Sequence, residues 1–149
     1  MQTNKEMDGG DNRAVLKARL GSPIGLLAVD GSEAVGWVAV APRASYSRLA
    51  RSKITAPVSE DISDVWSVTC FYVRRDSRRQ GVTSLLLDAA VSHAAKAGAR
   101  AVEGYPIDTE GRKLQAGELY HGRLEMFLGA GFELVERRGT RRALVRRGL

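Results

Sequence analysis

Cysteine and histidine are scarce in this sequence. One cysteine, Cys70, and two histidines, His93 and His121, occur among 149 residues. A single cysteine excludes an internal disulfide and a zinc site built on cysteines. The histidines lie 28 positions apart, without the spacing of a metal-binding pair. We therefore expect no metal site, and the low cysteine content favours a cytoplasmic setting.

Long apolar runs are also absent. No stretch approaches the roughly 18 residues that a membrane-spanning helix needs, so we expect no membrane association. Residues 1–10 lack the apolar core of a signal peptide. The composition, 44% hydrophobic and 27% charged residues, is that of a globular protein. We expect a polar tail over residues 1–10 and a single domain over residues 11–149.

Acidic residues are missing from the C-terminal end of the chain. Residues 137–149 carry six arginines and no acid, and residues 74–79 carry four arginines and one acid, Asp76. Such patches occur in nucleic-acid-binding proteins, in enzymes that attract an anionic cofactor and on solvated edge strands. No interleaving of aromatic and basic residues and no DNA-reading helix accompanies the arginines, so we expect no nucleic-acid partner.

What the sequence does contain is an alternation of strand and helix patterns. The predicted strands lie at residues 24–29, 34–40, 65–73, 99–105, 132–137 and 142–145. Asp30-Gly31 indicates a hairpin between the first two. The third is apolar on both faces, which predicts a central position. The strand at 65–73, the following helix and the strand at 99–105 imply a parallel pair of strands. We therefore expect an α/β fold with a mixed parallel and antiparallel sheet.

Helices are predicted at residues 13–20, 81–97 and 118–128. A single helical turn is expected near 46–50, inside an otherwise irregular segment. The expected core faces of the two longer helices are Val82, Leu85, Leu86 and Ala89 in the first and Tyr120, Leu124, Phe127 and Leu128 in the second.

The junction between the strand at 65–73 and the following helix carries the strongest functional signal. The basic stretch RRDSRRQG, residues 74–81, leads directly into the helix. The first N–H groups of a helix have no partner inside it, and the helix dipole favours negative charge there. Gly81 lets the backbone approach a ligand closely. This arrangement predicts a site for a phosphorylated ligand.

The same residues resemble a known family. The pattern Arg78-x-x-Gly81-x-Thr83 resembles the pyrophosphate-binding turn of the GNAT superfamily of N-acetyltransferases. The stretch FLGAGF, residues 127–132, is similar to the helix end and Gly-Phe strand start that close the GNAT core. The stretches GWVAVAP at 36–42, VWSV at 65–68 and VEGYP at 102–106 look like a bacterial branch of unassigned substrate. The resemblance spans residues 21–147.

The resemblance implies a GNAT-like central sheet flanked by helices, with acetyl-CoA as co-substrate. About twenty residues precede Gly21, so the family's first strand and first helix are expected to be missing. The backbone of residues 71–73 would pair with the pantetheine arm, and the N–H groups of residues 79–84 would surround the pyrophosphate. The implied cofactor-binding residues are Phe71, Tyr72, Val73, Arg78, Arg79, Gln80, Gly81, Val82, Thr83 and Ser84.

The catalytic groups of the family are displaced in this chain. Thr69 stands where many members have a glutamate on the central strand, and Phe127 stands where they have a tyrosine. Glu103 is the nearest carboxylate that could act as base, although it could equally pair with an arginine or face solvent. Tyr120 and Tyr105 are the candidate acids, and each could instead pack in the core.

Two functions are therefore expected in order of preference. The first is direct transfer of acetyl from acetyl-CoA to a primary amine, carried by a small molecule or a protein. The second is an acyl-CoA-binding regulatory module that has lost the chemistry. Cys70 could carry an acyl group, but a lone cysteine in a central strand is more often a small buried hydrophobe. A homodimer that covers an apolar face left by the short front remains an open alternative.

Overall fold

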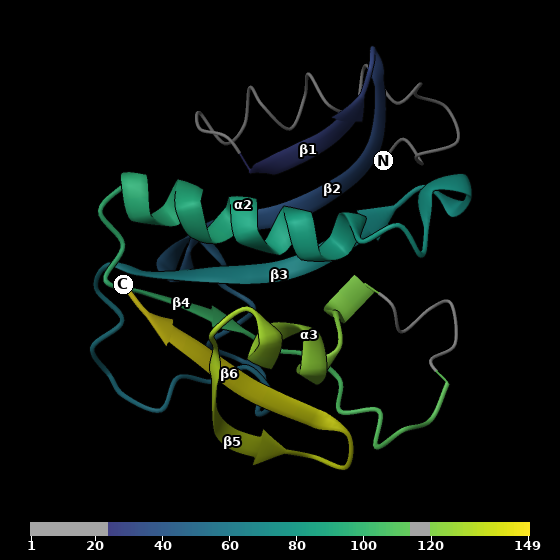
Figure 1. The fold of residues 1–149 in the computed structure, drawn as a ribbon. Coiled ribbons are helices and arrows are strands. Elements are labelled where there is room, and N and C mark those ends of the chain that lie inside the picture. The colour runs from purple at the N-terminus through teal and green to yellow at the C-terminus, as the bar shows by residue number, and fades with distance from the viewer. Residues whose placement is uncertain (1–23, 114–119) are drawn as a thin grey trace, which may run out of the picture.

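The computed structural model describes residues 24–113 and 120–149, which form one six-stranded sheet with helices against it (Figure 1). The strand order is β1-β2-β3-β4-β6-β5. The strands are β1 (Gly25–Asp30), β2 (Glu33–Pro42), β3 (Val65–Val73), β4 (Ala101–Gly104), β5 (Glu133–Arg138) and β6 (Arg142–Gly148). The predicted tail, the helix predicted at 13–20 and the question of a missing first strand and helix lie outside the described residues.

The sheet mixes the two strand directions, as predicted. β3 and β4 run parallel, with α2 (Val82–Lys96) between them in the chain, while every other neighbouring pair is antiparallel. The expected hairpin joins β1 to β2 through Gly31, whose φ of +62° suits glycine. β3 holds the predicted interior position, between β2 and β4. No helix in the described part of the chain is long and apolar enough to cross a membrane.

The sheet is irregular around the middle of β3. Ala39 pairs with Cys70 and Val40 with Val68, so Thr69 is the extra residue of a β-bulge. β4 pairs with β3 only along residues 65–68. Within the described residues, the downstream half of β3 therefore has no strand on its β4 side.

α2 covers one face of the sheet, with a side that only partly matches the prediction: Val82 and Leu86 pack against the core as predicted. Leu85 is 67% exposed and Ala89 is also exposed, so their assignment to the core was wrong. The buried residues of the helix are Leu86, Leu87, Ala90, Val91 and Ala94. Gly36 lets the helix sit close on β2, because a Cβ there would lie only 3.0–3.1 Å from Val82 and Leu86.

The second predicted helix is much shorter than expected. α3 spans only Leu124–Gly129. Gly122 has a φ of +79°, and Arg123 is extended and bridges to Ile107, so the chain cannot continue a helix through these positions. Tyr120 lies in a separate 3-10 turn and Leu128 is exposed, so neither belongs to the core face predicted for this segment.

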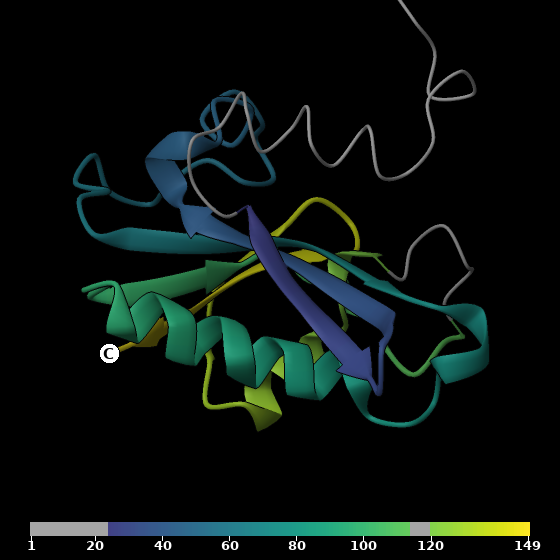
Figure 2. The same cartoon turned by 90° about the horizontal axis from the view of Figure 1, so that it is seen from above.

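The opposite face of the sheet carries the irregular segment 43–64. Figure 2 shows this segment and α2 on opposite sides of the sheet. Its one helical element is the 3-10 helix η1 (Arg43–Ser45), slightly before the predicted turn at 46–50. A second 3-10 helix, η2 (Arg75–Ser77), lies in the junction between β3 and α2.

Candidate active site

A cleft of about 760 Å³ opens where β3 ends and α2 begins. Nine of the ten residues expected to bind the cofactor line this cleft, all except Gln80. We call it the β3–α2 cleft, and its lining residues are Phe71, Tyr72, Val73, Ser77, Arg78, Arg79, Gly81, Val82, Thr83, Ser84, Lys113, Tyr120, Gly122 and Arg123. A cleft of this volume is within the ordinary range for small-molecule sites.

The start of α2 presents free backbone donors to the cleft. Gly81 is the N-cap, with a φ of +75°, and no side chain caps the helix. The first N–H groups of α2 are thus available to an anion. A Cβ at Gly81 would meet nothing within 4 Å, so the space in front of the turn is open. These features fit a phosphate group.

The arginines of the turn divide into two kinds. Arg74 is already occupied, because its guanidinium lies 2.7 Å from Asp76 and 3.0 Å from Glu33. The hydrogen bond from Arg74 is also the main reason that the pKa of Asp76 is lowered. Within the described residues, Arg78 donates Nε to the Val73 carbonyl at 3.1 Å and makes no other hydrogen bond to the protein, and Arg79 is exposed. Arg78 and Arg79 are therefore the arginines of the turn that face the cleft with donors to spare.

The floor of the cleft is aromatic. The ring of Phe71 meets that of Phe127 edge to face, with centroids 6.0 Å apart. A Cβ at Gly122 would come within 2.9–3.1 Å of both rings and of Met126, so the glycine allows this wall to close on the aromatic floor. Beside it, the unpaired edge of β3 runs from the bulge at Thr69 to Val73.

The far wall holds residues that the sequence pattern did not reveal, namely Lys113, Gly122 and Arg123. The sequence signal that could have indicated a break in the expected helix is Gly122, directly before Arg123. Tyr120, one of the predicted acids, also lies on this wall with its side chain 46% exposed. Its ring stacks on His121 at 3.9 Å, and the His121 ring lies 3.2 Å from Arg142. Four cationic side chains and no carboxylate line the described part of the cleft.

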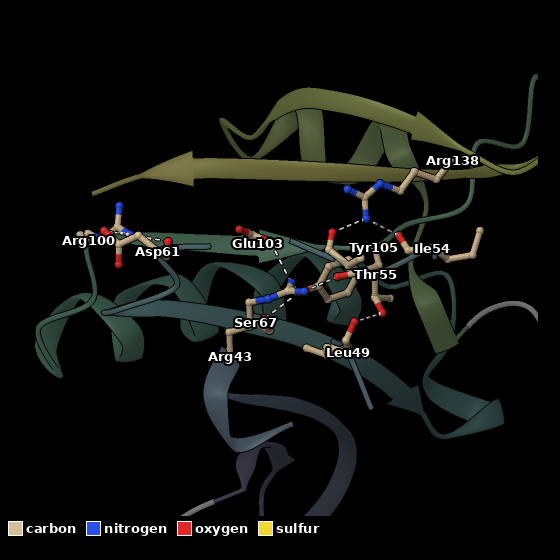
Figure 3. Close-up of polar contacts among 11 residues, drawn as sticks. Arg43, Leu49, Ile54, Thr55, Asp61, Ser67, Arg100, Glu103, Tyr105 and Arg138 are labelled. Atoms are coloured by element: carbon tan, nitrogen blue, oxygen red, sulfur yellow. Dashed lines mark hydrogen bonds and ion pairs between the residues drawn. The ribbon is translucent and has the colours of Figure 1, made fainter. Parts of the chain in front are cut away.

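Glu103 and Tyr105, the other predicted catalytic residues, do not reach the cleft. Both are buried beneath segment 43–64, where Arg43 donates to the Glu103 carboxylate at 3.1 Å and to the Tyr105 hydroxyl (Figure 3). Ser67 lies 2.7 Å from the same hydroxyl. Burial raises the pKa of Tyr105 to about 12. We call this group of four the Arg43 network.

Comparison with known proteins identifies the family. The sequence model described as "Acetyltransferase (GNAT) family" matches residues 6–120, more than half of the chain. The chain belongs to the GNAT family of acetyltransferases. A search of curated proteins finds no match.

Solved structures agree with this GNAT fold at low sequence identity. A ribosomal-protein-alanine N-acetyltransferase from Brucella melitensis matches with a TM-score of 0.60 and 16% identity, over 96% of this chain and 80% of that one. A GCN5-related N-acetyltransferase from Kribbella flavida matches with the same score and identity, over 100% and 82%. A candidate acetyltransferase from Salmonella typhimurium, solved with its cofactor acetyl-CoA, matches with a TM-score of 0.60 and 14% identity, over 95% and 74%.

Two positions show how this GNAT chain departs from the family pattern. Thr69, in place of the glutamate, forms the bulge and shares a hydrogen bond with the Tyr46 side chain. Phe127, in place of the tyrosine, is fully buried against Phe71 and Phe132.

Burial raises the pKa of the Cys70 thiol, so at neutral pH it stays protonated and is a poor nucleophile.

Proposed function

We propose that this protein is an acetyl-CoA-dependent N-acetyltransferase that transfers acetyl directly to a primary amine in the cytoplasm. The observation that carries the proposal is the β3–α2 cleft, in which an unpaired strand edge and an uncapped helix N-terminus open onto the same space. A peptide-like arm can pair with the first, and a diphosphate can bind the second.

The residues divide the binding work according to their chemistry. The backbone of residues 71–73 pairs with the amide groups of the pantetheine arm. The N–H groups of residues 79–84 surround the diphosphate, and Arg78 and Arg79 add charge-assisted hydrogen bonds. Lys113 and Arg123, across the cleft, extend the positive field toward the phosphate on the ribose of coenzyme A.

Bound acetyl-CoA supplies a thioester whose carbon–sulfur bond breaks as the amine nitrogen forms a bond to the acetyl carbon, so that an ammonium yields an amide, a thiol and one proton. Two tyrosines, Tyr72 and Tyr120, line the cleft. Tyr120 donates the proton that the leaving sulfur takes up, because it lies on the wall that precedes α3, seven residues before Phe127, whereas Tyr72 belongs to the strand that pairs with the pantetheine arm. Glu103 is engaged by Arg43, so the incoming ammonium first gives one proton to water near Thr69. The second proton leaves the nitrogen after the attack and restores the Tyr120 hydroxyl that protonated the sulfur.

Calorimetric titration with acetyl-CoA tests the binding half of this proposal. Wild-type protein should bind, and Gly81→Glu should lose the binding because it places bulk and negative charge against the diphosphate. Gly98→Glu is the matched control, since Gly98 also has a positive φ and open space around it but lies beyond the opposite end of α2. Absence of binding in the wild type, or equal binding by Gly81→Glu, would refute the cleft as the cofactor site.

A second candidate is an acyl-CoA-binding module without chemistry, which Thr69 and the buried Phe127 favour because they replace the family's usual base and acid. Release of free CoA, measured over a panel of amines, separates the two candidates. Turnover above the rate of acetyl-CoA hydrolysis supports the enzyme, whereas tight binding with no turnover of any amine supports the module.

A further inference from the structure

A second hollow, of about 410 Å³, is lined mainly by residues of segment 43–64. This segment lies on the face of the sheet opposite α2 (Figure 2). We call it the back hollow, and its lining residues are Ser45, Tyr46, Ser47, Arg48, Leu49 and Thr69. Thr69 stands only two residues before Phe71 of the β3–α2 cleft. Because β4 does not pair with β3 beyond Val68, the hollow and the cleft approach each other where the sheet is open.

The wall of the back hollow is held in place by buried hydrogen bonds. Arg43, just before this wall, donates to Glu103, to Tyr105 and to the Thr55 carbonyl, and the Thr55 hydroxyl donates to the Leu49 carbonyl at 2.8 Å (Figure 3). Arg138 of β5 donates to the carbonyls of residues 54 and 56. Segment 43–56 is therefore fixed against the sheet, which gives the hollow a defined shape before any ligand arrives.

The chemistry of the hollow is selective. Its lining offers hydroxyl groups and one cation, Arg48, and contains no carboxylate. Arg48 is exposed and has no ion-pair partner in the described part of the chain. Arg51 and Lys53 follow it, and residues 43–59 include no acid. An anionic group is attracted to such a surface, whereas an amine with additional positive charge is repelled.

We propose that the back hollow is the acceptor site and that it takes a primary amine that also carries a carboxylate, with Arg48 as the partner of the carboxylate. This inference rests on the function proposed above. The amine nitrogen lies beside Thr69, where it can reach the acetyl carbon through the open part of the sheet. The C–N bond forms as the C–S bond breaks. The nitrogen loses two protons in all: one goes to water, and the other balances the proton that Tyr120 gives to the sulfur, which leaves as the thiol.

Matched pairs of acceptors test the carboxylate. Phenylalanine is compared with phenethylamine, histidine with histamine, and β-alanine with ethylamine, while phosphoethanolamine against ethanolamine probes phosphate. The release of CoA gives kcat/KM, and calorimetric titration of each amine into the protein, with and without CoA, gives an affinity that does not depend on turnover. Carboxylated members should be preferred in both measurements.

Variants of two neighbouring arginines sharpen the test. Arg48→Gln should lower kcat/KM and affinity for carboxylated amines by about tenfold or more, which is the effect of losing one charge-assisted hydrogen bond. It should leave neutral amines and the affinity for acetyl-CoA unchanged. Arg51→Gln, the matched control outside the lining of the hollow, should change neither.

The outcomes separate this inference from the function on which it rests. Three results would overturn the proposed acceptor site. These are a preference for the amines without a carboxylate, a loss of activity in Arg51→Gln equal to that in Arg48→Gln, and tighter binding of phosphoethanolamine than of the carboxylated amines. Failure of the wild type to bind acetyl-CoA would instead refute the cofactor cleft, and titration of the amines without CoA would still decide the acceptor site.

Discussion

Arginine performs two opposite tasks on the two faces of the sheet. In the Arg43 network the guanidinium is 2% exposed and is already bound by Glu103, Tyr105 and a backbone carbonyl. In the β3–α2 cleft Arg78 and Arg79 are exposed, and Arg78 donates one N–H to the protein. The N–H donors of Arg43 are bound within the fold, whereas Arg78 and Arg79 have donors that can bind a ligand. Partners and solvent, rather than residue type, decide the role of each cation.

The comparison predicts that the two faces fail in different ways, and the largest effect belongs to the buried face. Arg43→Met leaves the Glu103 carboxylate buried without its partner, which should cost about 3–5 kcal/mol of the free energy of unfolding. Urea denaturation measures this loss. The double variant Arg43→Met/Glu103→Leu removes both charges and should recover much of the stability. A single variant as stable as the wild type would show that the ion pair does not hold this face together.

The cleft face should fail in catalysis instead. Tyr120→Phe keeps the ring that lies against His121 and removes the hydroxyl that we propose as the proton donor to the leaving sulfur. Loss of a general acid should reduce kcat by about 100-fold. Stability and the affinity for acetyl-CoA should remain as in the wild type, since the side chain is 46% exposed. An unchanged kcat would exclude Tyr120 as the acid.

The same contrast explains what the sequence could predict. The cleft turn is contiguous, from β3 through residues 74–81 into α2, and short-range rules on strand ends and helix N-termini describe it well. The β3–β4 parallel pair and the terminal hairpin of β5 and β6 follow from similar local patterns. The strand, turn and helix, the parallel pair and the hairpin were confirmed as structure, because each is decided by a continuous stretch of chain. The assignment of the turn as a cofactor site stays a prediction.

The remaining features depend on residues far apart in the sequence. Arg43 and Glu103 are 60 positions apart, and nothing near Glu103 indicates which arginine it meets. Lys113 lines the cleft from a loop, and Arg123 lines it directly after Gly122, whose positive φ interrupts the helix expected at 118–128. On α2 an apolar stripe broader than one face allowed two orientations that share Val82 and Leu86. Packing against the distant strands shows that Leu87 and Ala90, rather than Leu85 and Ala89, complete the buried side.

Alkaline pH gives a subtler way to disturb the buried face. The pKa of Tyr105 is raised by burial from 10.0 to about 12, so the folded protein keeps this proton at a pH where the unfolded chain has lost it. The stability contributed by the neutral phenol is present below pH 10 and is lost as pH rises toward 12, amounting to about 2–3 kcal/mol. Urea denaturation between pH 9 and 12 should show this fall. Tyr105→Phe should be less stable than the wild type at every pH, but its free energy of unfolding should fall less steeply with pH. An equally steep fall in the variant would exclude Tyr105 as the source of the pH dependence.

The smallest expected effect compares two arginines within the same turn. Arg78→Gln should weaken acetyl-CoA binding by about fivefold, because one exposed charge-assisted contact to phosphate is lost. Arg74→Gln should have much less effect, since that guanidinium already pairs with Asp76 and Glu33. Calorimetry at two salt concentrations distinguishes the two substitutions. The affinity of the wild type for acetyl-CoA should fall at the higher concentration, because salt screens the phosphates. Arg78→Gln should make this salt dependence of the affinity smaller. Equal effects of the two substitutions would mean that the general positive field of the turn, rather than the spare donors of Arg78, attracts the cofactor.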